Sequence, residues 1–218
     1  MKKTTIALSL SAALLAAPLT AAAESLSFGE EQTVRAMAGG NVGQAIASMM
    51  EAESLAVVNN RSAICGALTG GLGAGMLAAN PEAGFSIAGM EGPEDAADAV
   101  AAIGDAEVTY LAFGAGASRD DNVALAHALL VELAKAEWDG TLMLHISTWM
   151  QQQVQAAAEM DEAVAEYLTG RPMVALMPDM EAGEAVMLRV SFDGSEFATE
   201  EMGRQPMRDD LAELFRRM

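Results

Sequence analysis

The sequence predicts an α/β protein whose mixed, mostly parallel sheet is sandwiched by helices and has an antiparallel strand pair near the C-terminus. Between residues 85 and 177, short apolar runs alternate with helical patterns, which is typical of βαβ crossovers. The last two apolar runs, 173–177 and 186–192, are joined by about eight residues, too few for a crossover helix, so they should pair antiparallel. No linker or internal repeat divides the chain, and we expect one domain over residues 24–218.

The first two elements are a helix and a buried strand. Over Glu30–Glu53, apolar residues such as Val34 and Ile46 recur close to the helical period, although Gly39-Gly40 weakens the middle. Leu55–Val58 is short, apolar and β-branched, which suits a strand covered on both faces.

The glycine-rich stretch Ser62–Ala79 has two interpretations. As a dinucleotide-binding turn it matches the first two glycines of the G-x-G-x-x-G motif with Gly71-Leu-Gly73, but Met76 stands where the third glycine is needed. As a helix it carries the spacing G-x-x-x-G, which lets backbones approach closely, at Gly66/Gly70 and Gly71/Gly75. We favour tight helix packing and predict no cofactor. If the Gly66–Gly75 face were exposed, it would instead indicate packing between subunits.

The next elements alternate regularly. Acids follow Pro93 in the first turn of one helix, and β-branched or aromatic residues fill the strands. The predicted order is strand Phe85–Ala88, helix Pro93–Ile103, strand Glu107–Phe113, helix Asp120–Trp138, strand Leu142–Ile146 and helix Thr148–Leu168.

Three further elements are predicted toward the C-terminus. Strand Met173–Met177 is closed by Pro178, and strand Val186–Phe192 ends at the turn pair Asp193-Gly194. A final helix over Pro206–Arg217 has acids early and arginines late, the order that the helix dipole favours.

Residues 1–23 have the features of a secretory signal peptide. Lys2 and Lys3 precede an apolar run from Thr4 to Leu19, and Ala21-Ala22-Ala23 fits the signal peptidase site. The run is short for an uncleaved membrane anchor, the alternative interpretation. We therefore expect a mature chain that begins near Glu24, has no stable membrane span and resides in the periplasm.

The charge is strongly negative. Twelve Lys and Arg oppose 31 Asp and Glu, a net charge of −19, and loss of the two leader lysines leaves 10 basic residues against the same 31 acids. Such a chain cannot neutralise nucleic acid phosphates, so nucleic acid is excluded as a partner. A protein partner or a small ligand remains.

Two loops at strand ends are the candidate ligand-binding site. In open α/β sheets, ligands bind beyond the carboxyl ends of the strands, near helix N-termini. The candidate residues come from the glycine-rich loop before one helix and from the start of the next, and they are Gly114, Gly116, Ser118, Arg119, His145, Ser147 and Thr148. The alternative is that Ser118, Ser147 or Thr148 is a helix cap and His145 a satisfied core histidine.

The favoured function is a non-catalytic binding or accessory module, because no strong catalytic motif is present and no catalytic residue can be assigned. The alternative is a periplasmic hydrolase that uses Ser118 or Ser147 with His145, and Asp179 could join them. Ser118 lacks the closing glycine of the G-x-S-x-G motif, which weakens that alternative.

Metal sites are not indicated. The sequence has two histidines and one cysteine, too few for a His- or Cys-based zinc site, and the methionines near His145 form no clustered copper motif. Cys65 lies among small and apolar residues, so we expect a buried, inert thiol.

Overall fold

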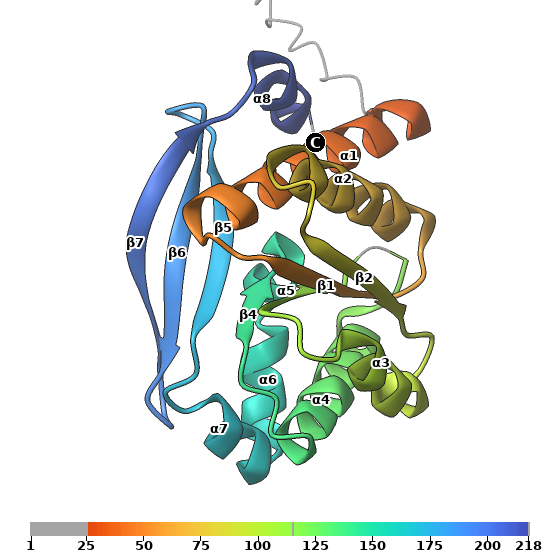
Figure 1. Ribbon diagram of the computed structural model, residues 1–218, viewed down its shortest axis with the longest axis vertical. Helices are drawn as coiled ribbons and strands as arrows, with labels where there is room; N and C mark the ends of the chain where they lie inside the picture. Colours follow the sequence, from red (N-terminus) through yellow and green to blue (C-terminus); the bar gives the residue numbers. More distant parts are fainter. Residues whose placement is uncertain (1–25, 115, 218) are drawn as a thin grey trace, which may run out of the picture.

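A computed structural model describes residues 26–114 and 116–217 of the chain. The expected signal peptide, residues 1–23, and its cleavage point lie outside the described residues. Figure 1 shows a central sheet with α1 and α2 on one side of its parallel strands and α3, α4 and α6 on the other. Helix α8 lies at one end of the sheet beside α1. None of the described helices combines the length and apolar character that a membrane span requires.

The sheet confirms the predicted fold class. Its seven strands lie in the order β2-β1-β3-β4-β5-β6-β7; β1 to β5 pair in parallel, and β5-β6 and β6-β7 pair antiparallel. The strands are β1 Ser54–Asn59, β2 Gly84–Gly89, β3 Val108–Ala112, β4 Thr141–Leu144, β5 Met173–Asp179, β6 Glu184–Phe192 and β7 Phe197–Pro206.

The helices cover both faces of this sheet. They are α1 Phe28–Met49, α2 Ala63–Ala79, the 3-10 turn η1 Pro93–Asp95, α3 Ala96–Ile103, α4 Arg119–Lys135, α5 Ile146–Met150, α6 Gln153–Met160, α7 Glu162–Leu168 and α8 Asp209–Arg216.

Alternate residues of each central strand enter two separate cores. In β3, Leu111 packs with the layer formed by α3, α4 and α6, whereas Tyr110 packs with the layer formed by α1 and α2. This follows from the two-residue period of a strand, which sends successive side chains to opposite faces. The hydroxyl of Tyr110 is therefore directed to the α1/α2 side of the sheet.

Helices α1 and α2 meet backbone to backbone through glycines. A Cβ added at Gly71 would collide with the carbonyl oxygen of Ala36, and one added at Gly75 with that of Gly40. Gly70, by contrast, is exposed and faces open space. The predicted tight packing is thus present within the chain for Gly71/Gly75, whereas the other predicted pair, Gly66/Gly70, faces open space.

The predicted helix Thr148–Leu168 is wrong as a single element, because the chain forms α5, α6 and α7 there. Gln152 has a left-handed backbone, φ 55°, which ends α5 and starts α6 in a new direction. Asp161 then leaves the helical region and accepts a hydrogen bond from the backbone nitrogen of Ala163, which caps α7.

Strand β7 was not predicted. Its residues are mostly exposed and polar, so it has no apolar alternation to identify it. It pairs with β6 at the sheet edge, where Arg189 of β6 forms an ion pair with Glu200 of β7 at 2.9 Å. The antiparallel part of the sheet is therefore one strand larger than the predicted pair.

The glycine contact predicts opposite effects for two alanine substitutions on α2. Gly75→Ala should lower the free energy of unfolding by about 1–3 kcal/mol, since overpacking forces the helices apart. Gly70→Ala should leave it unchanged or raise it by up to about 1 kcal/mol, because alanine favours a helix. Urea unfolding of the mature chain measures both values. Equal free energies of unfolding for the two variants would contradict the close contact at Gly75.

Candidate functional site

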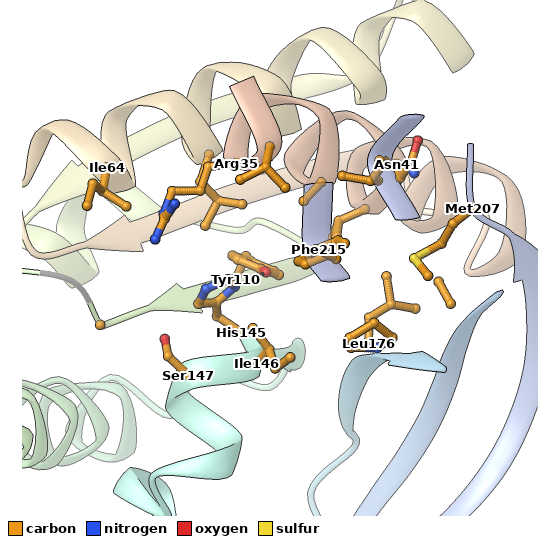
Figure 2. A pocket seen from close by; sticks show the side chains of 18 of the residues that line it. Arg35, Asn41, Ile64, Tyr110, His145, Ile146, Ser147, Leu176, Met207 and Phe215 are labelled. Carbon is orange, nitrogen blue, oxygen red and sulfur yellow. Dashed lines mark hydrogen bonds between the residues drawn. The ribbon is translucent and has the colours of Figure 1, made fainter. Parts of the chain in front are cut away.

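A cavity of about 230 Å³ lies on the α1/α2 side of the sheet, at the carboxyl ends of β3 and β4. Helix α1, the start of α2, the start of α5 and helix α8 complete its wall. Figure 2 shows Arg35, Tyr110, His145 and Ser147 toward one end, which we call the polar end. Leu176 and Met207 lie toward the other end, which we call the apolar end, although the polar residue Asn41 also lies toward it.

Tyr110 and His145 form a neutral pair at the polar end. The tyrosine hydroxyl and His145 Nδ1 are 2.7 Å apart, and His145 Nε2 has no hydrogen-bond partner among the described residues. Burial lowers the pKa of His145 to about 4, and the nearby charge of Arg35 acts in the same direction. Burial raises the pKa of Tyr110. Both rings are therefore uncharged at neutral pH.

Arg35 is the one charged residue in the cavity lining. It is half-buried, and within the described part of the chain its guanidinium makes one hydrogen bond, from Nη1 to the backbone oxygen of Glu31 at 3.0 Å. No described carboxylate oxygen lies within 4.0 Å of it, whereas six other arginines have such a partner: Arg61, Arg119, Arg189, Arg204, Arg208 and Arg217.

Cys65 lines the same cavity from the first turn of α2. Ser62 caps this helix by accepting a hydrogen bond from the Cys65 backbone nitrogen at 3.1 Å. The thiol donates to Asn60 Oδ1 at 2.8 Å. Burial raises the pKa of Cys65, and the charge of Arg35 opposes that effect only in part. The thiol is free and buried, as the sequence predicts, and stays protonated.

Helix α8 closes the apolar end. Its residue Phe215 packs with Met207 and with Leu176 of β5 in a small cluster, and Leu176 also packs against the α1/α2 core. An ion pair at 2.7 Å between Arg217 and Glu30 ties the end of α8 to α1. The cavity is thus bounded by the last helix of the chain as well as by the first.

The structure brings three of the seven predicted site residues into this cavity: Gly114, His145 and Ser147. The absence of a side chain at Gly114 matters, because a Cβ there would lie 2.5 Å from Ser147 Oγ. The predicted strand Leu142–Ile146 ends early, at Leu144, so His145 precedes α5 rather than lying in a strand. His145 and Ser147 nevertheless line the same cavity.

The other four predicted residues lie elsewhere. Ser118 caps α4 in a reciprocal pair with Asp121, and Arg119 donates from Nε to the backbone oxygen of Gln151 at 2.9 Å. Thr148 is fully buried, and its hydroxyl lies 3.0 Å from the backbone oxygen of Leu111. Gly116, with φ 91°, borders a separate depression on the α4 side of the sheet.

No described hydrogen bond joins His145 to a serine. Ser147 Oγ donates to the backbone oxygen of Phe113 at 2.9 Å, and Ser118 Oγ donates to Asp121 Oδ2 at 2.8 Å. Asp179 instead pairs with Arg204 at 2.8 Å. The nucleophile–base contact that a serine hydrolase needs is not formed among these residues.

Sequence reasoning missed Arg35, Tyr110 and the residues of α8. A signal existed for the first two. Arg35 directly follows Val34, a core position of the predicted first helix, and Tyr110 stands in a mostly apolar predicted strand, where a buried hydroxyl needs a partner. The contribution of α8 had no such signal, because it depends on tertiary packing.

The fold and the cavity define an α/β protein with a doubly covered mixed sheet and a partly apolar site at its strand ends. Residues 31–214 match a family model described as "Uncharacterized protein", and the chain belongs to that family. A comparison with curated proteins gave no match. Among the described residues, no group of three or more His, Cys, Asp or Glu could hold a metal ion.

The lowered pKa of His145 predicts a pH-dependent stability. Between the ordinary value of 6.5 and the folded-state value of about 4, the unfolded chain binds a proton that the folded chain does not. The wild-type protein should therefore lose stability relative to His145→Gln as the pH falls from 6.5 to 4, and the difference should be constant above 7. Urea unfolding across this range measures it, and parallel pH profiles of the two proteins would refute the assignment.

Proposed function

We propose that this protein is an exported, non-catalytic binding protein that holds a small, largely apolar ligand in the cavity between α1, the sheet and α8. The observation that carries this proposal is the cavity lining: apolar side chains dominate it, and most of its polar groups, among them Arg35 and His145, lie toward one end. Small-molecule sites in proteins have this composition.

The size of the cavity supports a small ligand. An apolar cavity of about 150 Å³ is enough to bind benzene. The cavity here, at about 230 Å³, is larger, and both α1 and α8 wall it in. A concave, walled site favours a small molecule over the surface of a protein partner, the other occupant that the sequence left open.

The condition of the candidate nucleophiles supports a binding role rather than catalysis. Ser147 Oγ donates its proton to a backbone oxygen and not to a base. Cys65 has a raised pKa, so its reactive thiolate form is rare at neutral pH. His145 has a ring nitrogen available, yet it contacts Tyr110 rather than a nucleophile.

The export part of the proposal rests on residues 1–23. If they are a signal peptide, the full chain expressed in a bacterium should appear in the periplasm with an N-terminus near Glu24. Intact-mass measurement of the periplasmic fraction tests this. A full-length mass, with Met1 retained in a membrane fraction, would instead indicate an uncleaved anchor.

The ligand proposal predicts that a neutral apolar probe binds in the cavity. N-phenyl-1-naphthylamine, whose fluorescence increases in apolar surroundings, should bind the mature protein saturably. Ala38→Phe places a ring at a position that lines the cavity and should weaken this binding at least tenfold.

Ala78→Phe is the matched control. Ala78 is exposed on α2 and does not line the cavity, so the same ring added there should leave probe affinity unchanged. Fluorescence titration of the three proteins provides the comparison. Absence of saturable binding, or equal affinity in Ala38→Phe, would overturn the proposed function.

A further inference from the structure

We infer that the ligand is an organic monocarboxylate with an apolar body, its carboxylate bound by Arg35 and its body directed toward α8. The inference rests on the proposed function and adds the chemical class of the ligand. Three observations support it: the charge of the cavity lining, the lack of a carboxylate partner for Arg35 among the described residues, and the separation of the polar and apolar ends.

The lining of the cavity differs in charge from the rest of the protein. The chain has 31 Asp and Glu and a net charge of −19. None of the 19 residues that line the cavity is an Asp or Glu, and Arg35 is a cation among them. In so acidic a chain, a site that holds a cation without any acid is matched to an anionic group from outside.

Arg35 has the donors to bind such a group. A guanidinium carries five N–H donors, and within the described residues one hydrogen bond from Arg35 is present, to a backbone oxygen. Leaving a half-buried cation without a counter-ion is unfavourable, since burial removes part of its hydration. A carboxylate fits the planar fork of arginine with two parallel hydrogen bonds.

The neighbours of Arg35 favour one negative charge over two. Tyr110 and His145 are neutral, and Cys65 stays a thiol, so the polar end carries a single positive charge at neutral pH. A phosphate monoester would bring a charge of about −1.5 to −2 into an apolar cavity that offers one cation. A carboxylate brings one charge, which Arg35 balances.

The apolar end accounts for the rest of the ligand. Leu176, Met207 and Phe215 form this end together with other apolar residues of the sheet and α8. Figure 2 places Leu176 and Met207 across the cavity from Arg35, with Phe215 between them. An aliphatic or aromatic body attached to the carboxylate would bury its apolar surface there, which favours binding.

The test is competition against N-phenyl-1-naphthylamine bound to the mature protein. Octanoate, 1-octanol and octyl phosphate share one apolar tail and differ in the head group. Octanoate should displace the probe at a concentration at least tenfold lower than either of the others, because a charge-assisted hydrogen bond has about that effect on affinity.

Two substitutions assign the preference to Arg35. The Arg35→Gln protein should still bind the probe, and octanoate and octanol should displace it equally well. The Arg35→Lys protein should keep part of the preference for octanoate because it keeps the charge. Arg189→Gln makes the same charge change at an exposed ion pair outside the cavity lining, and should keep the full preference.

The outcomes separate the two proposals. If the probe does not bind the wild-type protein, the proposed function fails. If it binds and octanol or octyl phosphate competes as well as octanoate, the cavity is a binding site but the carboxylate assignment is wrong. Retention of the octanoate preference in Arg35→Gln would also overturn the role of Arg35.

Discussion

The backbone contact between α1 and α2 sets the position of the groups in the cavity. Arg35 directly precedes Ala36, the residue whose carbonyl oxygen lies against Gly71. Cys65 is in the first turn of α2, and β3 and β4, below the two helices, bring Tyr110 and His145. Close packing restricts the position of one helix relative to the other, because protein interiors have little free space. A bulkier residue at Gly71 would therefore force α1 and α2 apart and disturb this arrangement.

Two kinds of electrostatic effect operate in this protein at different ranges. The acidic surface repels anions at a distance, and salt weakens that repulsion because the Debye length is about 8 Å at physiological ionic strength. Inside the cavity the partly excluded solvent strengthens the field of Arg35. Burial, and to a smaller extent this field, lowers the pKa of His145 and keeps its ring neutral. The protein thus combines a repulsive exterior with one local attractive charge, which favours selectivity over fast capture.

The sequence was a good guide where hydrophobic period decides structure and a poor one where tertiary contacts decide it. The strands up to Phe192 and the antiparallel pairing of β5 with β6 were predicted, since each has a clear apolar pattern. Strand β7 had none, and the breaks at Gln152 and Asp161 depend on local backbone geometry that no periodicity reveals. Of the candidate site, His145 and Ser147 followed from the rule about strand ends. Arg35 did not, because a charge on a predicted helix is ordinarily solvated.

The exposed outer strand β7 has a consequence for how the protein behaves at high concentration. An open sheet has two edges, and unpaired backbone groups on an edge can recruit another chain. Along β7 the residues Glu200, Glu201 and Arg204 place charged side chains at this edge, and Arg204 also pairs with Glu184 and Asp179. Charged side chains on an edge strand oppose the addition of a second copy to the sheet. The strand that hydropathy could not reveal is thus the one that discourages aggregation.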